Sequence, residues 1–383
     1  MCGAFGIGVS EFVVMGLLPQ IAVDLEPGLT AASPDAALAL TGGLVSGYAL
    51  GVVVGMVVTP LILRRLSEHR ILLLCAAVML IGTALTAASP NLAVAVVLRF
   101  LSALTHASYV GIASALVGRL LGSSHQGRGA AIVVGGLSVA NLLGVPVLTA
   151  LGSDGSWRAV LGVCAALFAV PVVALRCQAF PAAAVPARAA DGGGIGSRRL
   201  WSLIAVVTVL ASGCFAVTTF VAPISDLSQG PGGPVPISLL MLLFGAGMNL
   251  GNFGGGWTAD RSANGTLLLS GVVGIVGSIA VVIPSGSGLT VSAGVCAVGL
   301  SLGLLTPGAQ VLYVRTAREG SRLAASLAPG TINLGSFLGA VVGGAGLATA
   351  GPAAVGAIAA VCIGAATLLQ LLRMQGARVP QEG

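Results

Sequence analysis

The chain has 383 residues, of which 56% are hydrophobic and only 7% are charged, and its formal net charge is +6. An ordinary soluble domain has roughly 25% charged residues, so this composition excludes a soluble globular protein. It indicates an integral membrane protein.

Apolar runs long enough to cross a bilayer recur along the whole chain. A transmembrane helix needs about 20 mostly apolar residues. The runs predict an all-α membrane protein with twelve transmembrane helices, at residues 2–22, 40–63, 71–89, 92–117, 129–152, 157–177, 200–223, 236–258, 265–285, 288–313, 323–348 and 351–374. Short polar connections separate them.

The basic residues are all arginine and are distributed unevenly between the predicted connections. Fifteen of the 17 fall on one side of a twelve-span topology, whereas Arg158 falls on the other side and Arg99 lies within a span. Cytoplasmic loops are enriched in arginine, so we expect both termini in the cytoplasm of a protein of the inner or plasma membrane. This distribution does not indicate a nucleic-acid partner.

The longest connection, residues 178–199, is rich in proline, alanine, glycine and arginine and is predicted to be a linker. Six spans precede it and six follow, which indicates a six-helix half at 1–177 and a second at 200–383. Asn141 and Asn333 stand at similar places in the two halves. Such repeats place a substrate cavity between the halves near the bilayer midplane.

Two charged side chains, Glu11 and Arg99, lie within predicted spans. At 1.5 Å per residue, both are expected near the middle of the membrane. A charge there is costly and usually faces the bundle interior or a water-filled cavity. Glu11 can escape the cost by taking up a proton and arginine cannot, so we expect Glu11 to couple protons to substrate while Arg99 supplies a positive field.

The alternatives to this proton-coupling site are structural. Glu11 and Arg99 could form a static ion pair, or Arg99 could bind backbone carbonyls. His106, seven residues after Arg99, lies on nearly the same helical face and could relay protons or simply pack.

Several segments, in order, resemble motifs of the major facilitator superfamily. GWTADRSANG, with Asp260 and Arg261, resembles its loop motif, and VVLRFLSALTHASYVG resembles its intramembrane arginine motif. GGLSVANLLGVP resembles its antiporter motif, with Gly144 and Pro146 in matching positions. With SEF in the first span, the chain is similar to the twelve-span drug:proton antiporter branch, especially chloramphenicol exporters and sugar-efflux proteins.

This resemblance implies gating roles for Asp260, Arg261, Gly144 and Pro146. It also implies a proton-coupled exporter of a small organic compound, with an antibiotic such as chloramphenicol as the leading candidate. A sugar or metabolite facilitator of the same fold, without proton coupling, is the alternative.

Polar and aromatic side chains within the spans are candidates for the substrate site. They are Tyr48, Asn141, Phe215, Thr219, Asn249, Gln310 and Asn333. Apolar walls with a few polar groups suit a small amphiphilic compound. The seven cysteines form no CxxC pair, so no metal site or cofactor is predicted, and no paired acids or nucleophile triad suggests an enzyme. We expect a monomer in the lipid bilayer whose partners are substrate and protons.

Overall fold

A computed structural model describes residues 1–120, 126–153, 156–177, 198–228, 234–283, 287–316 and 323–376. Within these ranges the chain is helical, with short turns and no strand. It divides into two compact units, Met1–Arg188 and Ala189–Gly383. The all-helical membrane fold expected from composition is confirmed.

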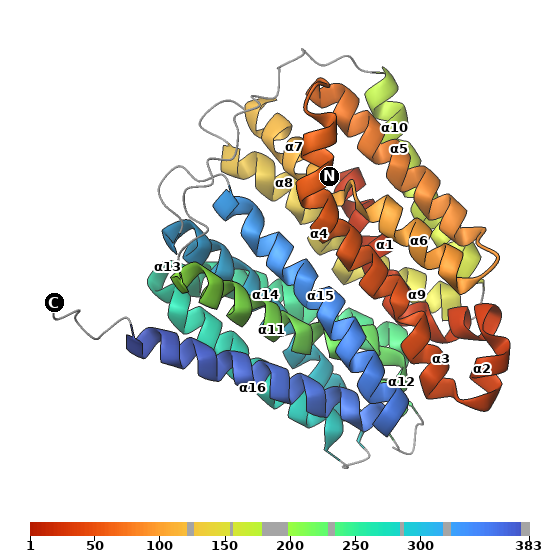
Figure 1. Cartoon of the computed structure of the whole chain (residues 1–383), viewed down its shortest axis with the longest axis vertical. Coiled ribbons are helices and arrows are strands. Elements are labelled where there is room, and N and C mark those ends of the chain that lie inside the picture. The colour runs from red at the N-terminus through yellow and green to blue at the C-terminus, as the bar shows by residue number, and fades with distance from the viewer. Residues whose placement is uncertain are drawn as a thin grey trace. The chain divides into compact units, whose positions relative to one another are not determined.

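The helices of the N-terminal unit are coloured red to yellow-green in Figure 1, where the long ones run side by side and two short ones lie together at one end. They are α1 (Cys2–Leu25), α2 (Pro27–Ala32), α3 (Pro34–Thr41), α4 (Gly43–Leu63), α5 (Glu68–Ala87), α6 (Leu92–Ala103), α7 (His106–Leu120), α8 (Gln126–Val139), a π-helical turn (Ala140–Gly144), α9 (Val145–Ser153) and α10 (Trp157–Cys177).

Two predicted spans of this unit are interrupted. The fourth divides into α6 and α7 around Thr105, whose hydroxyl donates to the carbonyl of Cys75 on α5 at 3.3 Å. The fifth contains the π-helical turn just before Pro146. Proline has no N–H for the carbonyl of Leu142, and a π turn is a common way to accommodate such a defect. Both interruptions lie within spans that the sequence predicts as continuous.

Glycines allow α4 and α6 to pack closely. Gly47, Gly51 and Gly55 lie one turn apart on the face of α4 that meets α6, where a Cβ at Gly47 would stand 2.9 Å from the side chain of Val96. Such small-xxx-small stripes let transmembrane helices approach each other. The stripe also sets how near the side chains of α4 come to those of α6.

The C-terminal unit, coloured green to blue in Figure 1, consists of α11 (Arg198–Thr219), α12 (Val221–Ser225), α13 (Ile237–Val282), α14 (Gly288–Thr316), α15 (Leu323–Ala350) and α16 (Pro352–Gly376). Glycines 247, 251 and 255 stand 200 positions after the α4 stripe, and they pack against α14 in the same way. This correspondence supports a duplicated architecture.

The predicted linker 178–199 needs a correction at its end. α11 begins at Arg198, so the last two residues of that range are helical. Arginine is a good helix former, and the helix continues one half-turn before the first apolar residue, Leu200. The remainder, 178–197, lies outside the described residues.

Helix α13 accounts for a difference in the number of spans. The described residues contain eleven helical segments long and apolar enough to cross a membrane, and α13 is one of them. Its 46 residues would extend about 69 Å, more than twice a hydrocarbon core of about 30 Å. Ser262 has non-helical backbone angles and divides it. The two pieces correspond to the predicted spans 236–258 and 265–285.

Candidate functional site

Helix α1 carries Glu11 near its middle and is buried on all sides. Nearly every residue from Gly3 to Leu18 is buried, because α1 packs against α8, α9 and α10 of the same unit. Glycines permit this packing: a Cβ at Gly8 would lie 2.8 Å from the Cβ of Ala140, and one at Gly16 would lie 2.6 Å from Thr149. Glu11 itself is 9% exposed.

Arg99 on α6 is fully buried, with 0% of its surface exposed. Its Nη1 donates to the hydroxyl of Ser10 at 3.0 Å, and its Nη2 donates to the backbone carbonyl of Ser10 at 3.0 Å. The guanidinium carbon also lies 4.2 Å from the ring centre of Tyr48, a cation–π distance. Among the described residues, no carboxylate oxygen lies within the 4.0 Å ion-pair distance of Arg99.

Glu11 instead lies next to His106, the first residue of α7. Its Oε2 is 4.0 Å from His106 Nδ1, and the same nitrogen shares a hydrogen bond of 3.2 Å with the hydroxyl of Tyr48. All three side chains are buried. The carboxyl, imidazole and phenol therefore form a short polar chain beside the guanidinium.

Four helices thus bring together the three predicted proton-coupling residues and one predicted substrate residue, Tyr48. The break between α6 and α7 does not separate Arg99 from His106, since both contact Tyr48. Ser10, which holds Arg99, is absent from the residues predicted from the sequence. The sequence feature that could have pointed to Ser10 is its hydroxyl, directly beside Glu11 in an otherwise apolar run.

The segment that resembles the antiporter motif, residues 135–146, forms the end of α8, the π-helical turn and the start of α9. A Cβ at Gly144 would stand 2.5 Å from Val9 Cγ2, so a larger residue would force the side chains of Val9 and Phe5 on α1 to move. Asn141, in the same turn, is 3% exposed. These contacts show the turn packed on the helix that carries Glu11, and the gating roles of Gly144 and Pro146 stay predictions.

The other predicted substrate residues belong to the C-terminal unit. Phe215 and Thr219 are buried in α11, and Gln310 in α14 is partly buried. The side-chain amides of Asn249 and Asn333 each donate to a carbonyl four residues earlier in their own helices, at 2.8 and 3.0 Å. Their substrate roles stay predictions.

The predicted gating pair, Asp260 and Arg261, lies on the exposed surface just before the break at Ser262. The guanidinium of Arg261 stacks on the ring of Trp257 at 3.5 Å, and its Nη1 donates to the Trp257 carbonyl at 3.2 Å. Both contacts are with the preceding turn of α13. A gate contact with another span stays a prediction.

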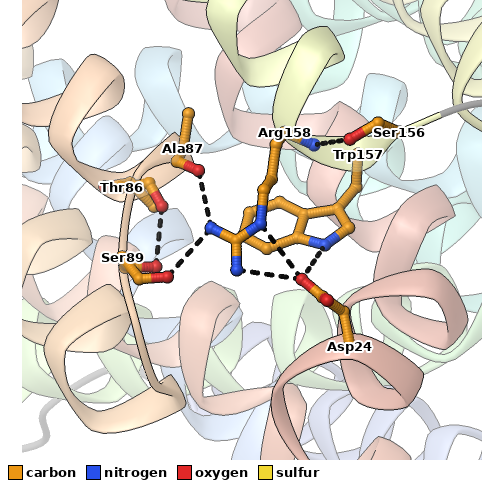
Figure 2. Close-up of polar contacts among 7 residues, drawn as sticks. All are labelled: Asp24, Thr86, Ala87, Ser89, Ser156, Trp157 and Arg158. Carbon is orange, nitrogen blue, oxygen red and sulfur yellow. Dashed lines mark hydrogen bonds and ion pairs between the residues drawn. The ribbon is translucent and has the colours of Figure 1, made fainter.

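A second polar cluster lies at the C-terminal end of α1 (Figure 2). Arg158 pairs with Asp24 at 2.9 Å and donates to the carbonyls of Ala87 and Ser89 at 2.8 and 2.9 Å. Trp157 Nε1 also donates to Asp24, at 3.0 Å. The cluster ties α1, the end of α5 and α10 together.

An open cavity of about 530 Å³ adjoins this cluster. It is lined by Pro19, Gln20, Val23, Asp24, Ser156, Trp157 and Arg158. Pro19, the lining residue nearest to Glu11 in the sequence, follows it by eight residues, or about 12 Å along α1, so the cavity is separate from the Glu11 cluster.

Apolar helices of membrane length around a buried cluster of carboxyl, guanidinium and imidazole groups define a multi-pass membrane transport protein. Residues 1–325 match the family model of the Major Facilitator Superfamily. The chain belongs to this superfamily, as the motifs in the sequence suggested.

Two curated relatives illustrate the range of similar proteins. The chain is 31% identical over 347 residues to the inner membrane transport protein YdhP of Escherichia coli K12, covering 90% of this chain and 86% of YdhP. It is 29% identical over 278 residues to a chloramphenicol resistance protein of Streptomyces lividans, covering 71% of this chain and 68% of that protein.

The fold is shared with solved transporters. The crystal structure of the peptide transporter POT superposes with a TM-score of 0.74 at 12% identity, covering 98% of this chain and 93% of POT. At that identity the likeness concerns the fold alone.

Proposed function

We propose that this transporter is a proton-coupled antiporter that exports a small organic compound by alternating access, with an antibiotic such as chloramphenicol as the leading candidate. The observation that carries the proposal is the buried carboxyl of Glu11. It lies 4.0 Å from His106 and makes no ion pair with Arg99.

A carboxyl in a tight ion pair is held in its ionised form, because the neighbouring positive charge stabilises the carboxylate. Here Arg99 is bound by Ser10 and Tyr48, so Glu11 can exchange a proton while Arg99 keeps its place. Antiport needs such a group: proton and substrate occupy it in turn, and each cycle exchanges one for the other. His106 is the titratable side chain next to the carboxyl and the candidate to exchange protons with it.

The similarity to a chloramphenicol resistance protein supports the choice of substrate. We also propose that the protein lies in the inner or plasma membrane with both termini in the cytoplasm, and that it works as a monomer. The arginine distribution and the inner membrane relative support the location.

The test is transport in proteoliposomes with and without an imposed pH gradient, using a panel of antibiotics, including chloramphenicol, and sugars. Glu11→Gln should abolish gradient-driven accumulation. Asp35→Asn, which removes a carboxylate from the short helix α3, is the matched control and should accumulate substrate like the parent. Full gradient-driven accumulation by Glu11→Gln would contradict proton coupling through this residue.

A further inference from the structure

Arg99 is a fully buried cation whose contacts among the described residues are with neutral groups. Two of its nitrogens donate to Ser10, one to the side chain and one to the backbone, and its plane lies over Tyr48. Its Nε has no hydrogen-bond partner among the described residues. The position of the guanidinium therefore depends on few contacts, and Ser10 supplies both of its hydrogen bonds.

The two contacts to Ser10 differ in what they require of the sequence. Any residue at position 10 has a backbone carbonyl, but only a serine or threonine presents a hydroxyl oxygen there. That hydroxyl accepts from Nη1 at 3.0 Å. Ser10 is 1% exposed, so water cannot readily replace the hydroxyl.

Glu11 is the next residue on α1 and offers the strongest acceptor nearby. An arginine and a carboxylate form charge-assisted, often bidentate hydrogen bonds when the guanidinium is free to turn toward the acid. In the structure it does not turn: Arg99 donates to Ser10, and Glu11 faces His106. The guanidinium is thus held by Ser10 and not by the carboxyl.

We propose that Ser10 is a positioning residue that holds Arg99 away from Glu11 and so leaves the carboxyl able to take up a proton. This inference rests on the proposed role of Glu11 in proton coupling. Without the hydroxyl, Nη1 loses its acceptor in a site where Nε already lacks one. The guanidinium then moves to Glu11, and the pair becomes a static salt bridge.

The protonation of Glu11 can be measured without a known substrate. Dicyclohexylcarbodiimide reacts with protonated carboxyl groups in apolar surroundings, and mass spectrometry of the labelled full-length protein in lipid gives the rate at Glu11. Glu11→Gln sets the background. An opposite charge within about 4–6 Å favours the ionised carboxylate by about tenfold or more. Ser10→Ala should therefore label about tenfold more slowly than the parent, and Ser10→Thr should restore most of the rate.

Ser102→Ala is the matched control. The hydroxyl of Ser102 is equally buried and donates to the backbone carbonyl of Arg99 at 2.9 Å, but it does not touch the guanidinium. Its removal should leave the labelling rate unchanged. Equal rates in Ser10→Ala and the parent, or an equal fall in Ser102→Ala, would overturn the positioning role.

A double variant separates positioning from local damage to α1. If Ser10→Ala acts through the guanidinium, then Ser10→Ala combined with Arg99→Gln should label at least as fast as the parent. A double variant that labels as slowly as Ser10→Ala would show that the substitution disturbs the helix itself, and the inference would be wrong. The labelling rates do not depend on transport. If Ser10→Ala slows labelling as expected but Glu11→Gln transports like the parent, the positioning role of Ser10 stands and only the proposed proton coupling is rejected.

Discussion

The close approach of α4 and α6 can be tested by adding one methyl group, in Gly51→Ala. The new Cβ would lie 2.8 Å from the Cβ of Ala103 and even nearer to the carbonyl oxygen of Phe100. Carbon atoms in contact prefer about 3.5–4.0 Å, so the two helices must separate by about 1 Å. Because Tyr48 is one turn away on α4, the separation also draws its ring from Arg99.

The size of the effect follows from two opposing contributions. Overpacking of a well-packed interface costs about 1–3 kcal/mol, whereas replacing glycine by alanine in a helix gains up to about 1 kcal/mol. Gly43→Ala in the same helix is the matched control, because its Cβ would meet Val96 at 3.5 Å, an ordinary contact. It adds the same methyl group without the clash, and because Gly43 is the first residue of α4 its helix gain is smaller than at an interior position. We expect Gly51→Ala to be about 1–2 kcal/mol less stable than Gly43→Ala.

The assay can use the protein's own thiols. Cys75, Cys164 and Cys214 are buried and free, so a thiol-reactive fluorophore reports unfolding as they become accessible. Titration with a denaturing detergent then gives the free energy of unfolding of each variant. Equal stability of the two variants would refute the argument that direct backbone contact at Gly51 sets the helix spacing.

The other predictions concern the repeat, the polar cluster of Figure 2 and the Tyr48 contacts. Gly251→Ala, whose Cβ would stand 2.9 Å from Leu304 N, should be destabilised about as much as Gly51→Ala in the same unfolding assay, and unchanged stability beside a destabilised Gly51→Ala would count against equivalent packing in the two units. In a double-mutant cycle with Arg158→Gln and Asp24→Asn, the half-exposed pair should show a coupling energy of about 1 kcal/mol or less. Tyr48→Phe loses one hydrogen bond to His106 but keeps the ring under Arg99, so it should cost about 0.5–1.5 kcal/mol, whereas Tyr48→Leu should cost more; equal losses would argue against the cation–π contact.

Much of the fold could be predicted because the membrane imposes it. Apolar runs of about 20 residues can only be spanning helices here, and a charge among them is conspicuous because it is expensive. Depth and helical spacing, together with the motif around Arg99, therefore single out Glu11, Arg99 and His106 as candidates. The structure then shows Tyr48 in contact with two of them.

The partners of these side chains could not be predicted in the same way. Ser10 and Arg99 are 89 residues apart, and which atoms meet depends on the register between α1 and α6. The positions of these two helices depend on glycine contacts with further helices, such as Gly8 of α1 on Ala140 and Gly51 of α4 on Phe100 of α6, which involve three-dimensional packing. Pro146 marks a defect in the fifth span, but the π-helical form of the turn before it is not specified by the sequence pattern, and the break at Thr105 lies in an apolar run with no proline.

The central claim is that Glu11 gives up its proton when substrate binds. The most direct measurement is the proton released when chloramphenicol, or the compound transported in the panel, is added to the purified protein in weakly buffered detergent solution. The parent and Asp35→Asn should release protons, and Glu11→Gln should release none. Undiminished release by Glu11→Gln would contradict the claim.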